Sequence, residues 1–136
     1  GLGTDAGVVL GSLECVMKIK SSPIFRGASP CSPASLYAML KGEDIYAQEY
    51  DKLQNNLIKF GKLVKDLEMF SSIPKFPVFT SRDVRLFDIL YSKRLLISSF
   101  PYPLPMSPLL NRVVISSLHK EDDLIYLADV CAINKS

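Results

Sequence analysis

The chain has 136 residues, of which 48% are hydrophobic and 22% are charged. These values are ordinary for a globular protein and exclude a disordered or fibrous chain. The formal net charge is +2, which is too small to indicate a nucleic-acid or membrane protein by itself. A chain of this length suits one core, so we expect a single α+β domain over residues 1–136, with residues 1–7 flexible.

The cysteines argue against a disulfide framework and against a structural metal. Cys15, Cys31 and Cys131 are odd in number and widely spaced, which is typical of reduced thiols in the cytoplasm or the nucleus. A zinc site with four ligands would need all three cysteines together with His119, the only histidine. We therefore expect no metal and no cofactor, and no small-molecule substrate is evident.

The first third of the chain predicts a strand followed by a short helix. Between residues 8 and 20, apolar Leu13, Cys15, Met17 and Ile19 alternate with polar residues, and a period of two is typical of a strand. Farther on, a helix is expected, because Ser32 suits its N-cap, Pro33 its first position and Gly42 its C-terminal end.

The strongest pattern is an apolar seam whose steps alternate between four and three residues. This heptad period predicts one amphipathic helix over residues 43–70, about 42 Å long at about 1.5 Å per residue. Gly61 could break this helix, and Ile73 before Pro74 ends it. The seam comprises Tyr46, Tyr50, Leu53, Leu57, Phe60, Val64 and Leu67.

Beyond residue 75 the sequence predicts one more helix and two strands. Thr80 and Asp83 have the spacing of a capping box, which predicts a helix from there to Ile97. The prolines in residues 98–108 indicate an extended segment, either an ordered crossover or a ligand for a proline-recognising domain. Residues 112–118 and 124–133 then predict a hairpin whose loop is His119–Asp123.

The expected order is thus strand, three helices and two strands. Helices that lie between strands usually cover one face of the sheet. The sequence therefore predicts an α+β fold with an antiparallel sheet of three to five strands, helices packed on one face, and one long amphipathic helix among them.

The leading functional prediction is a non-enzymatic interaction or assembly module, such as a scaffold or structural subunit or a homodimer. The seam has two interpretations, a core helix on its own sheet or a helix that binds a second copy or another protein. Its tyrosines are common at protein interfaces. The expected partner-binding residues are Tyr46, Tyr50, Leu53, Leu57, Phe60 and Val64.

Two alternatives come from other side chains. Residues 59–94 contain eight basic and four acidic residues, so an anion-binding adaptor for RNA, DNA or an acidic membrane surface is the second hypothesis. The third is a cysteine-dependent enzyme, in which Cys31 near a helix N-terminus would act with His119 as base. The expected anion-binding residues are Lys59, Lys62, Lys65, Arg82 and Arg85.

Overall fold

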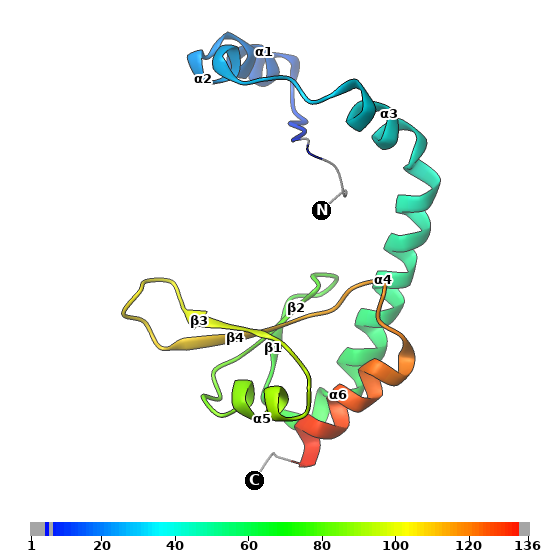
Figure 1. Ribbon diagram of the computed structural model, residues 1–136, viewed down its shortest axis with the longest axis vertical. Coiled ribbons are helices and arrows are strands. Elements are labelled where there is room, and N and C mark those ends of the chain that lie inside the picture. The colour runs from blue at the N-terminus through cyan, green and yellow to red at the C-terminus, as the bar shows by residue number, and fades with distance from the viewer. Residues whose placement is uncertain (1–4, 6, 134–136) are drawn as a thin grey trace. The chain divides into compact units, whose positions relative to one another are not determined.

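The structure is a computed structural model that describes residue 5 and residues 7–133. Figure 1 shows its elements in chain order. They are α1 (Leu13–Ser21), α2 (Pro23–Gly27), α3 (Pro33–Lys41), α4 (Glu43–Leu63), the 3-10 helix η1 (Lys65–Leu67), β1 (Ser71–Ser72), β2 (Val78–Ser81), α5 (Leu86–Ser92), β3 (Ser98–Pro101), β4 (Leu109–Val114) and α6 (Glu121–Ile133).

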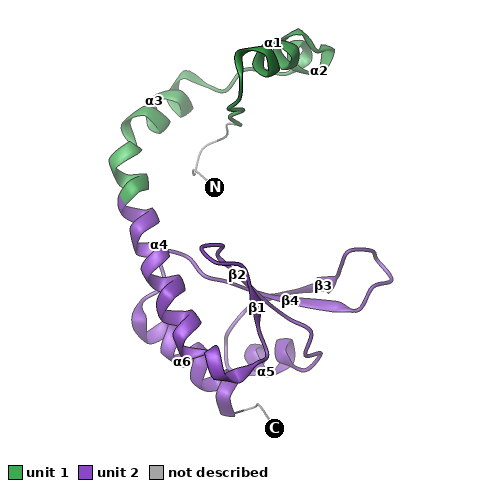
Figure 2. Cartoon of the chain, turned by 180° about the vertical axis from the view of Figure 1, so that it is seen from behind, with its two compact units in different colours: residues 1–47 green, residues 48–136 purple. Residues whose placement is uncertain are grey.

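The chain comprises two compact units, residues 1–47 and residues 48–136 (Figure 2). Each unit is described separately below. The single domain expected over residues 1–136 stays a prediction. Of residues 1–7, expected to be flexible, only Asp5 and Gly7 lie inside the described part of the chain.

The second unit contains a four-stranded antiparallel sheet in the order β1-β2-β4-β3. Central strand β4 places Arg112 opposite Thr80 of β2 and opposite Ser98 of β3. Because side chains alternate between the faces of a strand, Phe79 and Val113 share one face, while Arg112 lies on the other. The predicted α+β class, the antiparallel sheet and the long helix are confirmed.

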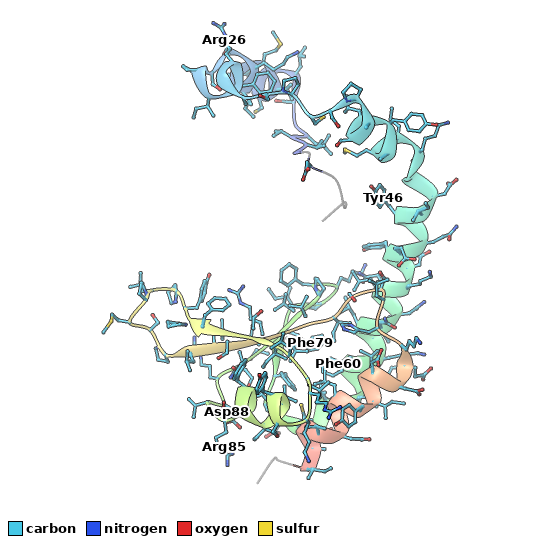
Figure 3. All side chains as sticks on the ribbon, viewed as in Figure 1. Arg26, Tyr46, Phe60, Phe79, Arg85 and Asp88 are labelled. Carbon is cyan, nitrogen blue, oxygen red and sulfur yellow. The ribbon has the colours of Figure 1, made fainter. Side chains whose placement is uncertain are left out.

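Helices α4, α5 and α6 pack on the sheet face that carries Phe79 and Val113. Phe60 of α4 is fully buried and meets the ring of Phe79 edge-on, with 4.8 Å between ring centroids (Figure 3). A buried aromatic pair of this geometry stabilises a core beyond its area alone. The core also contains Leu57, Val64, Leu86, Leu90, Ile115, Leu124, Leu127, Ala128, Val130 and Cys131.

The strand predicted over residues 8–20 is wrong, because residues 13–21 form helix α1. Ser12 caps it by accepting a hydrogen bond from the backbone N–H of Cys15, and Glu14 forms an ion pair with Lys18 one turn later, at 2.8 Å. The apolar residues that suggested a period of two also fit a helix, since Leu13, Val16 and Met17 have the spacing of one helical face.

The hairpin predicted at the end of the chain is also wrong, because its second strand is helix α6. Asp123 accepts a hydrogen bond from the backbone N–H of Lys120, and three acidic residues in the first turn suit the helix dipole. The last three residues of the expected loop His119–Asp123 are therefore the start of a helix. Leu124, Leu127 and Cys131 recur at helical spacing and are buried.

The segment between residues 80 and 108 differs from expectation as well. Thr80 pairs with β4 as part of β2, so the predicted helix is shortened to α5, and Asp83 instead accepts a hydrogen bond from the backbone N–H of Arg85. The proline segment contributes its first residues, Ser98–Pro101, to the sheet as β3. The predicted order of strands and helices is therefore wrong in these segments, while the predicted α+β class is confirmed.

Helix α3 confirms the predicted capping. It begins after Ser32, whose side chain accepts a hydrogen bond from the backbone N–H of Ser35, and it ends at Gly42. A Cβ at Gly42 would lie 2.9 Å from the ring of Tyr46, which explains why this buried position needs glycine. Helix α4 runs through Gly61 and ends at Leu63, seven residues before the end predicted for it.

Candidate functional site

The two halves of the seam have different environments. Leu57, Phe60 and Val64 are between 0% and 8% exposed, because they pack into the core of the second unit, and Leu53 packs partly against the same core. The prediction that these side chains bind a partner is corrected: Leu57, Phe60 and Val64 are covered by the domain itself. The core-helix interpretation applies to this half of α4.

The two seam residues near the start of α4, Tyr46 and Tyr50, are more exposed, whereas Leu67 packs partly against the core. Tyr46 belongs to the first unit, is partly buried and packs over Gly42. Tyr50 is 55% exposed and lines a groove of about 510 Å³ between α4 and the β1–β2 turn. Ile58, Ile73 and Phe76 are also exposed along this groove, so apolar surface is available there.

The first unit carries its apolar side chains on the outside. None of the residues in α1, α2 or α3 is buried, although each helix contains large hydrophobic side chains. An exposed apolar set of this kind marks an interaction surface or an aggregation hazard. We call it the N-terminal apolar set, and its members are Leu10, Leu13, Met17, Ile24, Phe25, Leu36, Tyr37 and Leu40.

The basic residues proposed to bind anions are all exposed, and two of them have carboxylate neighbours. Lys59 forms an ion pair with Glu121 at 2.7 Å, and Arg85 forms one with Asp83 at 3.4 Å. Each pair cancels one positive charge locally, which weakens the case for a common patch with Lys62, Lys65 and Arg82. The anion-binding adaptor stays a prediction.

Arg112 is the only charged residue in the four strands of the described sheet. Its guanidinium carbon lies 4.4 Å from the ring centroid of Phe100 and 5.2 Å from that of Tyr102. Among residues 5 and 7–133, its side chain forms no ion pair and no hydrogen bond. A guanidinium that lies over aromatic rings and has no carboxylate partner keeps N–H donors available for an anion.

Arg112 was not among the predicted site residues, although two signals in the sequence could have indicated it. One is the position of this arginine in residues 109–115, where every residue except Arg112 and Asn111 is apolar. The other is the pair Phe100 and Tyr102, which flank a proline and alternate like residues of one strand face. Because β3 was not predicted as a strand that pairs with β4, the sequence could not show that Arg112 lies beside Phe100 and Tyr102.

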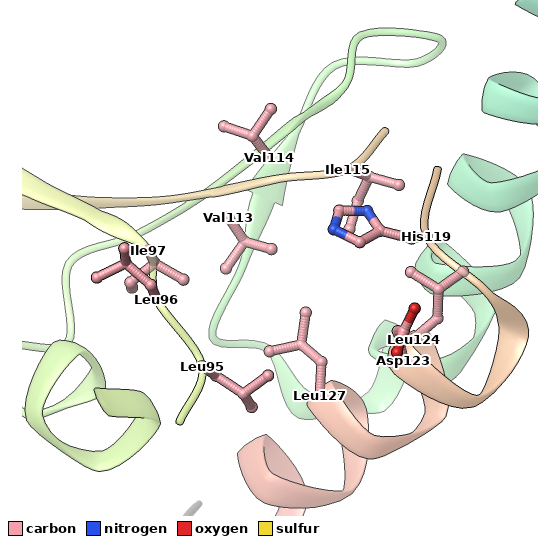
Figure 4. A pocket seen from close by; sticks show the side chains of 10 residues that line it. All are labelled: Leu95, Leu96, Ile97, Val113, Val114, Ile115, His119, Asp123, Leu124 and Leu127. Carbon is pink, nitrogen blue, oxygen red and sulfur yellow. The ribbon is translucent and has the colours of Figure 1, made fainter. Parts of the chain in front are cut away.

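Cys31 and His119 belong to different units, and the enzyme proposed on them stays a prediction. Nδ1 of His119 accepts a hydrogen bond from the backbone N–H of Ser116 at 3.0 Å, which places the ring proton on Nε2. His119 lies with Asp123 beside a small, mainly apolar cavity of about 100 Å³ (Figure 4). Cys131 is buried in the core, and burial raises the pKa of its thiol to about 11.

The described residues contain neither a metal-binding group nor a membrane-spanning helix. In the ranges 5 and 7–133, no three His, Cys, Asp or Glu side chains are grouped so that they could hold a metal ion. No helix built from those residues has both the length and the apolar character that crossing a bilayer requires.

Comparison with known proteins shows a similarity of fold. No protein-family model and no curated protein sequence matches the chain. Among solved structures, 8-amino-7-oxononanoate synthase from Francisella tularensis matches 90% of this chain with a TM-score of 0.65 and 19% sequence identity. The chain spans 39% of the length of that synthase chain. At this identity the likeness concerns the fold alone.

Proposed function

We propose that this chain is an association module, one part of a larger protein assembly that it joins through its first unit. The observation that carries the proposal is that α1, α2 and α3 bury none of their own residues. These helices have nine, five and nine residues, whereas isolated helices shorter than about 12–15 residues are marginal in water. Contact with another protein surface would supply the burial that they lack.

The N-terminal apolar set, rather than the seam of α4, is the contact surface that we propose. The N-terminal apolar set offers eight large side chains, and full burial of each removes roughly 60–120 Å² of apolar area from water. Because they are 48–90% exposed, together they would contribute roughly 330–660 Å², which is a large part of the ~800 Å² per side of a standard interface. The partner is a second copy of the chain or another polypeptide. The reduced thiols support a cytoplasmic or nuclear location, which belongs to the same proposal.

Sedimentation velocity of the full chain, together with native mass spectrometry of the complex from its source, tests this proposal. We expect a dimer, or a complex of fixed stoichiometry with another polypeptide. Leu13→Asp combined with Ile24→Asp should dissociate it, since both side chains are largely exposed, at 79% and 86%.

Ala34→Asp combined with Ala38→Asp is the matched control, because it adds the same two charges at exposed small residues of α3. It should leave association unchanged. Leu57→Asp is the second control and should unfold the second unit, because Leu57 is a core residue. A monomer without a stoichiometric partner in its source would contradict the association proposal.

A second candidate function is supported by Arg112. We propose that the assembly is a synthase-type enzyme and that this chain supplies a binding site for a substrate carboxylate. The free, ring-stacked guanidinium supports this role, because arginine binds carboxylates with two parallel hydrogen bonds. The fold likeness adds support, since the name of the similar synthase describes a product with a carboxylate, a ketone and an amine.

Titration of the native assembly with 8-amino-7-oxononanoate, followed by calorimetry, tests this second candidate. Arg112→Ala should weaken binding at least tenfold, and Arg112→Lys should restore little of it, because an ammonium cannot form the two-point contact. Equal affinity of Arg112→Ala and the unchanged protein would remove this candidate and leave the association module untouched.

A further inference from the structure

The groove between α4 and the β1–β2 turn lies wholly within the second unit and has a volume of about 510 Å³. Volumes of about 300–1,000 Å³ are typical of sites for small molecules. Ile58, Ile73 and Phe76 line the groove, yet their side chains are 57%, 67% and 52% exposed. Large apolar side chains that stay exposed in a concave site favour a ligand with an apolar body.

Gly61 leaves room on the α4 side of this groove. Glycine inside a helix costs stability relative to alanine. A Cβ added at Gly61 would meet no atom of the described residues within 4 Å, apart from its neighbours in the helix, so the packing of the second unit does not require glycine here. A bare backbone in the wall of a groove is instead suited to the close approach of a ligand.

The charge of the groove favours an anion. Lys75 is the only charged residue among those that line it, and within the part of the chain that the structure describes its ammonium has no ion-pair partner. Lys75 adopts the left-handed region, with φ at 64°, in a turn that the backbone N–H of Phe76 closes by donating to the carbonyl of Ile73 at 3.0 Å. An unpaired ammonium beside an apolar groove is complementary to a ligand with a negative charge.

Gln54 contributes a second unpaired group to the lining. Its amide nitrogen Nε2 is shielded from water and has no hydrogen-bond partner among the described residues. A shielded donor without a partner costs stability. The terminal torsion of a glutamine is soft, so this amide can turn toward an acceptor in the groove, and an oxygen of the ligand would supply that acceptor.

We infer that the groove binds an amphiphilic anion, which is a small molecule with an apolar body and one carboxylate or phosphate group. The apolar body occupies the space beside Ile58, Gly61 and Phe76, and the anionic group pairs with Lys75. The groove shares no residue with the N-terminal apolar set or with the rings beside Arg112, so this inference goes beyond both proposed functions and depends on neither.

The test is a titration of the ¹⁵N-labelled full chain with decanoate, decyl phosphate and decanol, each added separately at constant pH and ionic strength. The readout is the amide shifts of Gly61, Ile73 and Phe76, which separate binding in the groove from binding at other exposed apolar side chains. Both anions should shift these amides, and the better of the two identifies the preferred anionic group. Decanol should bind at least about threefold more weakly, because it cannot pair with the ammonium.

Two variants act on the two parts of the ligand. Lys75→Asn removes the charge with a residue that tolerates the left-handed region, and it should weaken decanoate binding to the level of decanol. Gly61→Leu fills the space beside α4 and should abolish binding, while the urea midpoint should not fall, because leucine is a better helix former than glycine. Lys65→Asn changes an exposed lysine outside the groove, and this matched control should bind decanoate as the unchanged chain does.

Three results would overturn the inference. The first is that neither anion shifts the amides of the groove, or that a folded Gly61→Leu variant binds decanoate as tightly as the unchanged chain. The second is equal binding of decanoate by Lys75→Asn and the unchanged chain, since the anionic group would then contribute nothing. The third is a set of shifts that follow protein concentration rather than added anion, which would place a second copy of the chain in the groove.

Discussion

Phe60 is the residue on which the core of the second unit most depends. It is fully buried, and its ring contacts those of Phe79 and Phe70, with centroids 4.8 Å and 6.1 Å away. Its place in the heptad seam was predicted from spacing, but spacing cannot say which neighbour covers a residue. The rings that contact it belong to Phe70 and Phe79, ten and nineteen residues farther along the chain.

Phe60→Ala should lower the free energy of unfolding of the second unit by about 3–5 kcal/mol, because it removes a ring and leaves a cavity. Urea unfolding followed by tyrosine fluorescence measures the loss. Ile58→Ala, at a position that is 57% exposed in the same helix, is the control and should cost less than about 1 kcal/mol. Equal losses for the two variants would contradict the assigned orientation of α4.

Cys131 makes the stability of the second unit dependent on pH in the alkaline range. Its folded pKa is raised to about 11 by burial, whereas an unfolded thiol ionises near pH 8.5. The folded state therefore resists loss of the proton, so the stabilisation is complete below about pH 8.5 and is lost as the pH rises toward 11.

The urea midpoint of the unchanged protein should fall more steeply across this window than that of Cys131→Ala. The difference between the two curves isolates the contribution of the Cys131 thiol. Parallel curves from pH 8 to pH 11 would show that Cys131 is not shielded from water.

At the scale of elements, the side chain of Asn56 links α4 to the turn between β4 and α6. The amide Nδ2 of Asn56 donates hydrogen bonds to the carbonyls of Ser116 and His119, each at 2.9 Å. These bonds connect segments about sixty residues apart in the chain. No local pattern predicts such a contact, because an asparagine on a polar helix face usually meets water.

Asn56→Ala should destabilise the second unit by about 1–3 kcal/mol, since two partly buried carbonyls lose their donor. Asn55→Ala, one position earlier and exposed, is the matched control and should change stability by less than about 0.5 kcal/mol. Chemical denaturation of both variants checks the difference, and amide exchange at the first turn of α6 should accelerate in Asn56→Ala alone.

Local signals explain which elements could be predicted from the sequence. Ser32, Pro33 and Gly42 act on their own helix, so α3 was predicted correctly, and the long periodic seam identified α4. Helix α1 was mistaken for a strand because its apolar residues fit both the period of a strand and that of a helix. A strand needs a neighbouring strand to pair with, and a local pattern cannot show whether one is there. The contact of Arg112 with Phe100 and Tyr102 depends on the β3–β4 register, which no single segment contains.

At the scale of the whole molecule, the two units differ in how they are stabilised. The second unit has a core that joins three helices to a sheet, while the helices of the first unit bury nothing of their own. Stability is therefore expected to be uneven along the chain, with local opening concentrated before residue 48.

Hydrogen exchange of the full chain should show this difference directly. Amides of α1–α3 should exchange within seconds when the chain is alone, and those of Phe60 and Leu90 should be protected for hours. Addition of the associating partner, or a higher concentration if the partner is a second copy, should slow exchange in α1–α3. Protection of α1–α3 in the isolated monomer would contradict the association module.

If the chain associates as proposed, the exposed helices of the first unit would also affect how much of this protein a cell retains. A newly made copy without a partner would expose apolar, easily opened segments, which proteases and chaperones recognise first. Surplus copies would then be degraded, while assembled ones survive. The steady amount of this polypeptide would follow the supply of its companion rather than its own rate of synthesis.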